Sequence, residues 1–412
     1  MNTTSPLGDL LSTILERRPF ARGDDDGRSI EALCHSLLSQ KTEKTGMQVA
    51  TAILDRYEQM DRDEKLGFFR FLNDEFDVDR DEIVRLAKAY AEDPTSKAYV
   101  DLSKGGEAKR LALFRRLNEP PGATTKLVRM RADMLGFLRS EPDLKRVDHD
   151  FVHLLTSWFN RGFLVLRQIT WDSSATVLEK VIEYEAVHEI RNWDDLRRRL
   201  QPADRRCFAF FHPAMPDEPL IFVEIALVNG VPNSVQTLLA DDREILSEDS
   251  ADTAVFYSIS NCQKGLAGIS FGNSLIKQVA RDLSRDLPNL KTFVTLSPIP
   301  GLVRWLEESE KADLATDDTS LKQLAAHYLL EEKSRNDLPR DPVARFHLSN
   351  GAQVYAVHAG ADTSANGIAQ SKGAMVNYLY DLKRISKNLE AFAETGTVAA
   401  TSTMKSLARK VQ

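Results

Sequence analysis

The segment from Ala254 to Gly301 constrains the fold of this chain more than any other. It reads AVFYSIS, NCQKGLAGISFGN, SLIKQVARDLSRDL and TFVTLSPIPG, which predicts a strand, a glycine-rich turn, an amphipathic helix and a second strand that ends in Ser-Pro. Backbone N–H groups at such a turn, and at the helix that follows it, favour a phosphate or pyrophosphate. The first hypothesis is therefore a phosphate-bearing ligand whose reactive group lies near the second strand.

The rest of the chain predicts two domains, because 412 residues exceed one ordinary hydrophobic core. Residues 1–150 follow a helical pattern, and from about Gln168 onward strand-like runs alternate with helices. We therefore expect an α+β protein. An all-helical bundle over residues 1–155, of the kind that often mediates self-association, precedes a mixed-sheet domain over residues 156–412 with helices at its C-terminus.

Individual elements follow from periodicity and from Gly and Pro breaks. In the first domain we expect helices near 30–38 and 49–57, and over 65–75, 80–91, 107–118, 124–138 and 144–160. In the second we expect strands over 207–211, 220–228, 254–260, 292–296, 344–348 and 353–358, and helices over 174–186, 193–200, 274–287, 303–311, 321–333, 375–392 and 401–411. Asn229-Gly230 is typical of a turn between two strands.

Composition limits the class of protein. Hydrophobic residues make up 42% of the chain and charged residues 28%, which is typical of a soluble globular protein. The net charge of −7 argues against a duplex nucleic-acid partner, and no apolar run approaches the length of a membrane span. Three cysteines without a C-x-x-C pair favour a reducing compartment and no structural zinc. With no secretion signal at the start and no peroxisomal address at the end, a cytoplasmic protein is expected.

The glycine-rich turn allows a second interpretation. Gly268-Ile-Ser270-Phe-Gly272 matches the G-x-S-x-G nucleophile elbow, in which Ser270 would attack an ester. An elbow follows its strand directly, whereas residues 261–267 intervene here, and the repeated βα units of a hydrolase sheet are missing. The elbow is therefore the weaker interpretation.

Other residues with chemical potential have simple structural explanations. Ser297 ends an apolar strand before Pro298, where a serine commonly caps a helix. His347, expected beside a hairpin, is the best general acid or base of its domain, although most such histidines are structural. His149 and His153 share one helix face at a spacing that can bind a metal, but no third ligand is signalled nearby. Cys262 is expected to be a small buried residue.

Several motifs of the second domain resemble those of malonyl-CoA decarboxylases. In consistent order from about Leu154 to Tyr380 these motifs are Ile169-Thr-Trp171, Glu185-Ala-Val-His188, His212-Pro-Ala-Met-Pro216 with Glu218-Pro219, Phe256-Tyr-Ser-Ile-Ser260, Gln263–Gly268, Leu296-Ser-Pro-Ile-Pro-Gly301, Phe346-His-Leu-x-Asn-Gly351 and Asn377-Tyr-x-Tyr380. SPIPG and FHLxNG are the most distinctive of them. The N-terminal helices are similar only in character.

The resemblance implies a GNAT-like fold for the second domain, with Ser297 and His347 as catalytic residues and Tyr380 as a further active-site residue. It also implies that the glycine-rich turn holds the pyrophosphate of coenzyme A. The residues expected at the CoA are Gln263, Gly265, Ala267, Gly268, Ile269, Ser270, Phe271, Gly272 and Asn273. Ser270 departs from the family pattern, which has a glutamate there. If that carboxylate orients the histidine in relatives, water or another residue must do so in this chain.

The chemistry implied is loss of CO₂ from malonyl-CoA to give acetyl-CoA, without a metal or a redox cofactor. The bond electrons pass into the thioester as an enolate. His347 would then protonate the carbon while Ser297 hydrogen-bonds the carboxylate, or Ser297 would act as a proton acceptor within a Ser–His pair, and the sequence leaves both roles open. The expected partners are malonyl-CoA and further copies of the chain in a dimer or tetramer. Two other functions stay open: an acyl-CoA N-acyltransferase of the same fold, and a non-catalytic acyl-CoA sensor.

Overall fold

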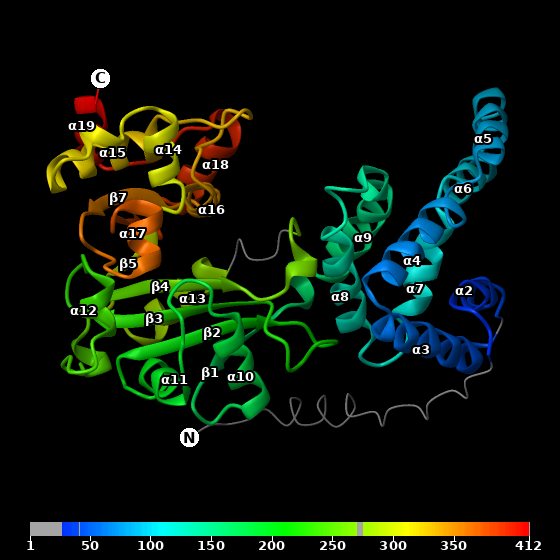
Figure 1. The fold of residues 1–412 in the computed structure, drawn as a ribbon, viewed down its shortest axis with the longest axis horizontal. Coiled ribbons are helices and arrows are strands. Elements are labelled where there is room, and N and C mark those ends of the chain that lie inside the picture. The colour runs from blue at the N-terminus through cyan, green and yellow to red at the C-terminus, as the bar shows by residue number, and fades with distance from the viewer. Residues whose placement is uncertain (1–26, 41, 270–274, 412) are drawn as a thin grey trace. The chain divides into compact units, whose positions relative to one another are not determined.

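The computed structural model describes residues 27–40, 42–269 and 275–411. Within these ranges the chain forms two compact units (Figure 1). The first unit is taken from Met1–Leu164, His212–Pro216 and Gln263–Ser270, and the second from Val165–Phe211, Asp217–Cys262 and Phe271–Gln412. Two short segments of the sheet-containing half of the sequence therefore pack with the N-terminal helices.

The first unit is a bundle of helices, coloured blue to teal in Figure 1. Its helices are α2 (Ile30–Ser39), α3 (Glu43–Gln59), α4 (Arg62–Asp74), α5 (Arg80–Glu92), α6 (Ser96–Gly105), α7 (Lys109–Leu117), α8 (Ala123–Leu135) and α9 (Lys145–Trp158), with 3₁₀ turns η1 (Pro142–Leu144), η2 (Arg161–Phe163) and η4 (Lys264–Leu266). Apolar faces of these helices form the core, in which the rings of Phe114 and Phe151 stack at 4.1 Å. Asp61 and Glu64 close a capping box at the start of α4.

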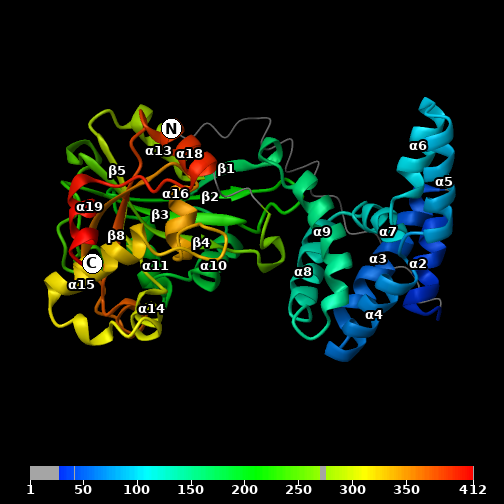
Figure 2. The same ribbon diagram turned by 90° about the horizontal axis from the view of Figure 1, so that it is seen from above.

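The helices α5 and α6 lie side by side as a hairpin that extends from the bundle (Figure 2). Leu86 is the only buried residue of α5, and α6 has no buried residue among those described. The sequence pattern did not predict α6. Thr95 caps its first turn by accepting a hydrogen bond from the Ala98 N–H, and this local signal is what starts the helix after Pro94.

The second unit is built on an eight-stranded mixed sheet. Its strands are β1 (Val165–Ile169), β2 (Arg205–Phe211), β3 (Ile221–Val228), β4 (Thr253–Asn261), β5 (Thr292–Thr295), β6 (Ser297–Pro298), β7 (Gln353–His358) and β8 (Met375–Leu379). The order is β1-β2-β3-β4-β5-β8-β6, and β7 pairs with β8. Neighbouring strands run antiparallel except β4 and β5, which are parallel. The β4–β5 ladder ends at Phe256–Thr295 although β4 continues to Asn261, so the two strands separate there.

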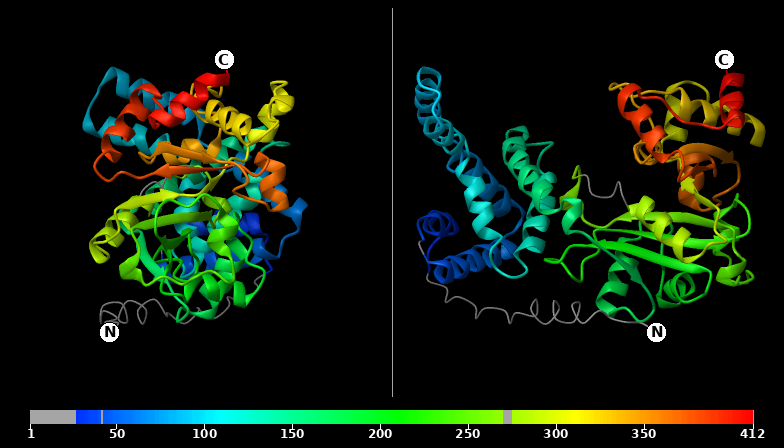
Figure 3. Two further views of the ribbon diagram at one scale, coloured as in Figure 1. Left: turned by 90° about the vertical axis from the view of Figure 1, so that its left-hand side faces the viewer. Right: turned by 180° about the vertical axis from the view of Figure 1, so that it is seen from behind.

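Helices cover this sheet, and further helices follow its last strand, β8, in the chain. They are α10 (Ala175–Tyr184), α11 (Trp193–Leu200), α12 (Val235–Leu239), α13 (Leu275–Asp286), α14 (Leu302–Glu308), α15 (Asp318–Leu330), α16 (Pro342–Leu348), α17 (Ala365–Ser371), α18 (Ile385–Thr395) and α19 (Ser402–Ala408), with 3₁₀ turns η3 (Glu248–Ser250), η6 (Ala312–Leu314) and η7 (Arg409–Val411). Apolar side chains of α10 and α11 pack on one face of the sheet against β2 and β3. The yellow, orange and red helices gather around β7 and β8 (Figure 3).

The expected fold class, a helical N-terminal region followed by a mixed-sheet domain, is confirmed, and the GNAT-like character of that domain stays a prediction. Three local predictions are wrong. Residues 344–348 belong to helix α16 and not to a strand, and residues 375–379 form strand β8 at the start of what was expected to be a helix. Asn229-Gly230 is not a hairpin turn, because the connection from β3 to β4 contains α12 and η3. Strands β1 and β6 were not predicted.

No helix in the described ranges is both long enough and apolar enough to cross a membrane.

Candidate active site

Ser297 lies in the sheet where the chain leaves β5. The N–H of Leu296 donates to the Phe256 carbonyl at 3.1 Å, and Ser297 then pairs with Val376 of β8. Pro298 at the second position of β6 keeps Ser297 extended. The serine is therefore a strand residue held on both sides by backbone hydrogen bonds, and not a helix cap.

His347 is presented by the short helix α16, whose ends are both specified by sequence. Asp341 caps the first turn by accepting hydrogen bonds from the Val343 and Ala344 N–H groups, and Pro342 occupies the first helical position. At the other end the Asn350 and Ala352 N–H groups donate to the His347 carbonyl. Gly351 has φ +83, and a Cβ there would lie 2.4 Å from the Ile385 carbonyl oxygen, so the turn requires glycine.

Three side chains expected at the active site form one continuous hydrogen-bonded chain. Ser297 Oγ lies 3.2 Å from His347 Nε2, and Tyr380 Oη lies 2.8 Å from His347 Nδ1. Tyr380 directly follows β8, and its N–H donates to the Phe293 carbonyl of β5 at 2.8 Å. The predicted convergence of serine and histidine, distant in the sequence, is therefore present in the structure.

The hydrogen-bonded chain continues beyond Ser297, and its next member determines which group donates the hydrogen bond between Ser297 and His347. The Ser297 hydroxyl donates to Thr295 Oγ1 at 2.8 Å, and Thr295 Oγ1 also accepts from the Tyr378 N–H. Since a hydroxyl has one proton, the hydrogen bond between Ser297 and His347 must be donated by Nε2–H. In a neutral imidazole Nδ1 then accepts from the Tyr380 hydroxyl. The resting ring thus carries its proton on the nitrogen beside Ser297.

Burial sets the electrostatics of these groups. Ser297, His347 and Tyr380 are 5%, 2% and 1% exposed. Burial lowers the pKa of His347 to about 3, so the ring is neutral at physiological pH, and it raises the pKa of Tyr380 well above its usual value. The Tyr378 ring stacks on the imidazole with centroids 4.4 Å apart. The histidine is therefore held in a buried environment by ring stacking and by hydrogen bonds at both ring nitrogens.

Ser297 and His347 open into a cavity of about 230 Å³. It is lined by Val187, Phe256, Tyr257, Ile259, Asn261, Ser297, Pro298, Pro342, Val343, Phe346 and His347. Most of these side chains are apolar, and among the described lining residues there is no Lys, Arg, Asp or Glu. The cavity can hold a small acyl group whose polar end meets the serine, the histidine and the Asn261 amide.

One wall of this cavity is fixed by Glu185. Its carboxylate accepts hydrogen bonds from the Val187 and His188 N–H groups, each at 2.8 Å, and from the Ser258 hydroxyl of β4 at 2.7 Å. The motif Glu185-Ala-Val-His188 is therefore a loop tied to β4, and this tie holds Val187 at the cavity wall.

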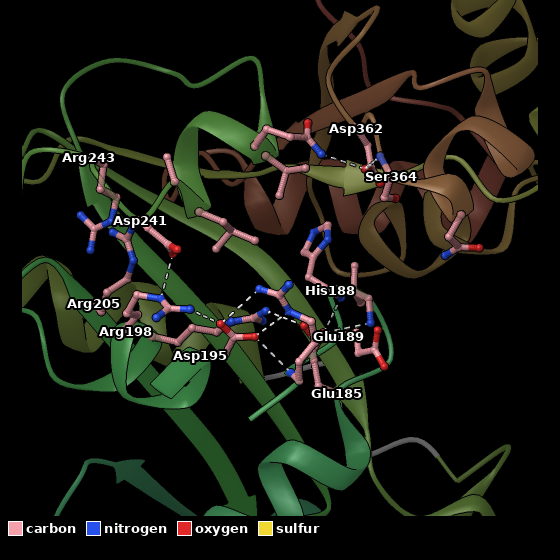
Figure 4. Close-up of a pocket in the computed structure, with 18 of the residues that line it drawn as sticks. Glu185, His188, Glu189, Asp195, Arg198, Arg205, Asp241, Arg243, Asp362 and Ser364 are labelled. Atoms are coloured by element: carbon pink, nitrogen blue, oxygen red, sulfur yellow. Dashed lines mark hydrogen bonds and ion pairs between the residues drawn. The ribbon is translucent and has the colours of Figure 1, made fainter. Parts of the chain in front are cut away.

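A second, larger cavity of about 820 Å³ lies across this loop (Figure 4). Its rim is strongly charged, but its arginines are matched by carboxylates: Arg198 contacts Asp195 and Asp241, and Arg199 contacts Glu224. Neither Ser297 nor His347 is among its lining residues. The balanced charge makes this cavity a poor candidate for a phosphate site.

The glycine-rich turn belongs to the first unit as far as it is described. Gln263 precedes η4, Gly265 is buried within it, and Ala267 and Gly268 follow, with Gly268 at φ +79. Ile269 is 8% exposed. The other residues expected at the CoA, Ser270, Phe271, Gly272 and Asn273, lie outside the described residues, and so does the nucleophile-elbow interpretation of Ser270.

The remaining candidates play no part in this site. His149 is largely exposed and its Nδ1 lies 3.5 Å from Asp150 Oδ1. Within residues 27–40, 42–269 and 275–411 no three His, Cys, Asp or Glu side chains are arranged to hold a metal ion. Cys262 is buried, as expected, and this burial raises the pKa of its free thiol.

Sequence reasoning missed Thr295, Tyr378, Asn261 and Val187 as members of the site. Tyr378 had no distinct signal, because both faces of β8 are buried and residues 375–379 lack the alternation of apolar and polar positions that indicates a strand. Thr295 lies two residues before Ser297 in the same extended segment, which puts both side chains on one face. Val187 and Asn261 had no local signal.

Comparisons with known proteins agree on one family. A family model described as "Malonyl-CoA decarboxylase C-terminal domain" matches residues 162–319 and 309–412, and one described as "Malonyl-CoA decarboxylase N-terminal domain" matches residues 76–159. The mitochondrial malonyl-CoA decarboxylase of Anser anser anser is 36% identical over 352 residues, which cover 73% of this chain and 69% of that protein. The rat protein of the same name is 33% identical over 351 residues, covering 73% and 71%.

Solved structures extend the match over the whole fold. The crystal structure of malonyl-CoA decarboxylase from Rhodopseudomonas palustris is 46% identical, covers 94% of this chain and 100% of its own, and superposes with a TM-score of 0.87. The enzyme from Cupriavidus metallidurans is 36% identical, covers 93% and 99%, and has a TM-score of 0.73. This chain therefore belongs to the malonyl-CoA decarboxylase family.

Proposed function

We propose that this protein converts malonyl-CoA to acetyl-CoA and CO₂ through a thioester enolate that His347 protonates. The observation that carries the proposal is the buried chain Ser297–His347–Tyr380 at the edge of an acyl-sized cavity. Membership of the family supports the substrate and the reaction class. The roles of the individual residues rest on the geometry and chemistry of the site.

The first step is cleavage of the bond to the carboxylate. When the substrate binds, the Ser297 hydroxyl turns from Thr295 Oγ1 to donate to the malonyl carboxylate. The carboxylate also accepts from His347 Nε2–H, and the two hydrogen bonds hold it out of the plane of the thioester carbonyl. The apolar wall removes water from the anion, and no Lys or Arg among the described lining residues pairs with it. The negative charge leaves the carboxylate as CO₂ departs. A site that gives the carboxylate only weak stabilisation therefore favours this step.

The released electron pair passes into the thioester carbonyl as an enolate. We propose that backbone N–H groups of β4 beyond Phe256, where the ladder to β5 has ended, donate to the enolate oxygen. A donor of this kind typically contributes about 3–4 kcal/mol to the transition state. The glycine-rich turn that follows β4 in the chain holds the pyrophosphate of the CoA, through the segment from Gln263 to Asn273.

The second step is protonation of the α-carbon. The resting imidazole of His347 is neutral, but the negative charge that moves onto the enolate raises the pKa of the ring, so His347 takes up a proton from solvent as CO₂ leaves. This proton passes from Nε2 to the α-carbon, and it balances the reaction, which consumes one proton for each CO₂ released. Tyr380 donates to Nδ1 of the neutral ring and accepts from Nδ1–H of the charged ring, so it satisfies both states.

This reaction requires no metal and no cofactor besides the CoA of the substrate. The expectation of a cytoplasmic location stays a prediction. We further propose that the chain self-associates through the α5–α6 hairpin, where Val84, Tyr99 and Val100 are 51%, 59% and 44% exposed.

The experiment is a product assay with purified protein and malonyl-CoA. We expect acetyl-CoA and CO₂ in equal amounts, and a loss of about 10²–10⁴-fold in kcat for His347→Ala, the range typical of a positioned acid. Ser297→Ala should also lose most of the rate. Wild-type rates in both variants would exclude the proposed roles. Transfer of the acyl group to an added amine without release of CO₂ would instead support the acyltransferase.

A further inference from the structure

The glycine-rich turn is held by one buried arginine of the helical unit. Arg131 lies on α8 and is 2% exposed. One of its terminal nitrogens, Nη1, donates to the Gly265 carbonyl at 2.6 Å and to the Ala267 carbonyl at 2.9 Å. Its Nε donates to Asp148 of α9 at 2.8 Å. A single guanidinium thus ties two helices of the bundle to two peptide groups of the turn.

The glycine-rich turn packs closely against α8. A Cβ on Gly265 would lie 1.8 Å from the Val128 carbonyl oxygen of α8, so only glycine fits there. The neighbouring Leu266 is 3% exposed and anchors the turn in the core of the same unit. The surface of α8 therefore determines the backbone of the turn as far as the structure describes it.

The two hydrogen bonds from Arg131 also orient the peptide dipoles. In a planar trans peptide the C=O and the next N–H point in opposite directions. Because the Ala267 carbonyl points at the guanidinium, the Gly268 N–H is directed away from it. The φ of +79 at Gly268 then bends the backbone in a way that glycine allows without strain. Outward N–H groups of this kind are what an anionic ligand requires.

We propose that Arg131 is a positioning residue for the nucleotide end of the CoA thioester. It acts through the turn and does not touch the ligand, because its side chain is buried and donates to Gly265, Ala267 and Asp148. This inference rests on the proposed function in one respect, namely that the turn holds the CoA pyrophosphate. It assigns to the helical unit a direct part in substrate affinity.

The test compares Arg131→Met with Arg110→Met as a matched control. Arg110 is also a buried arginine of the helical unit, but its guanidinium donates to Asp77 and Asp150 and not to the turn. Arg110→Met removes a partner of the buried Asp150, and Arg131→Met removes a partner of the half-buried Asp148 and of two carbonyls in the turn, so both variants lose a buried guanidinium and its hydrogen bonds. Arg131→Lys retains the positive charge beside Asp148, and it replaces Arg131→Met in the test if that variant does not fold.

Two substrates separate positioning from general damage: malonyl-CoA and malonyl-pantetheine, which lacks the nucleotide and its phosphates. In Arg131→Met we expect about a tenfold rise in KM for malonyl-CoA and in the calorimetric Kd of CoA, the size expected when a charged hydrogen-bond partner is lost. Arg131→Lys should show a smaller rise in both constants. The kcat with malonyl-CoA, and kcat/KM with malonyl-pantetheine, should stay at the wild-type value in both Arg131 variants.

Equal losses with the two substrates, equal losses in Arg110→Met, or an unchanged Kd for CoA would overturn the inference. The proposed function fails separately, if the wild-type protein releases CO₂ from neither substrate. In that case the Kd of CoA still tests Arg131.

Discussion

The hydroxyl of Tyr380 allows a precise test of how His347 is used. Tyr380→Phe removes one oxygen atom, 2.8 Å from His347 Nδ1, and leaves the ring contacts with Phe256 and His347 in place. Both partners of the lost hydrogen bond are buried, so bulk water does not replace the hydroxyl. The substitution therefore changes one interaction and little else.

The size of the effect follows from the charge of the imidazole. A hydrogen bond between neutral groups contributes about 0.5–1.5 kcal/mol, and one that involves a charged group contributes about 1.5–3 kcal/mol. If His347 is protonated when it delivers its proton, the variant loses about 1–1.5 kcal/mol more in that state than in the resting enzyme, which lowers kcat roughly five- to tenfold. KM should change little, because Tyr380 is not among the residues that line the cavity.

The assay is acetyl-CoA formation at saturating malonyl-CoA, with Tyr378→Phe as the control. Tyr378 stacks on the same imidazole, but its buried hydroxyl has no hydrogen-bond partner among the described residues. Its removal should leave kcat within about twofold of wild type. An unchanged kcat in Tyr380→Phe, or an equal loss in Tyr378→Phe, would refute the role given to the Tyr380 hydroxyl.

Three further predictions concern pH, specificity and assembly. Burial holds the native pKa of His347 at about 3, below the ~6.5 of an unfolded histidine, so the native state binds fewer protons than the unfolded state. The free energy of unfolding therefore falls as the pH drops from about 6.5 to about 3, and urea titrations should show a smaller fall in His347→Gln. Val187→Ala widens the acyl cavity and should raise kcat/KM for methylmalonyl-CoA relative to malonyl-CoA roughly tenfold, in a direct comparison of the two substrates. Replacing Val84 and Tyr99 by lysine should lower the mass measured by light scattering, and an unchanged mass would place the interface elsewhere.

The sequence was sufficient for elements with a clear pattern and failed where two patterns compete. The segment at 344–348 alternates apolar and polar residues like a strand, yet Asp341-Pro342 and Asn350-Gly351 are start and stop signals of a helix, and the structure follows these caps. Four of the five residues of β8 are buried, so both of its faces are covered and periodicity does not distinguish it from a buried helix.

The site was predictable only in part, for a related reason. Ser297 and His347 stand in motifs that can be recognised along the chain, and so does Tyr380. The contacts that complete the site depend on tertiary structure. Val187 reaches the cavity because Glu185 ties its loop to β4, and Asn261 because β4 continues past its ladder with β5. Neither relation leaves a pattern in the local sequence.

The central claim is that the malonyl carboxylate binds between Ser297 and His347. It is tested most directly by a crystal structure with the sulfonate analogue of malonyl-CoA, whose charged group cannot leave as CO₂. The account predicts sulfonate oxygens within hydrogen-bond distance of Ser297 Oγ and His347 Nε2, with the Tyr380 hydroxyl still on Nδ1. A sulfonate bound among the arginines of the larger cavity, or any acyl group that does not reach Ser297, would contradict it.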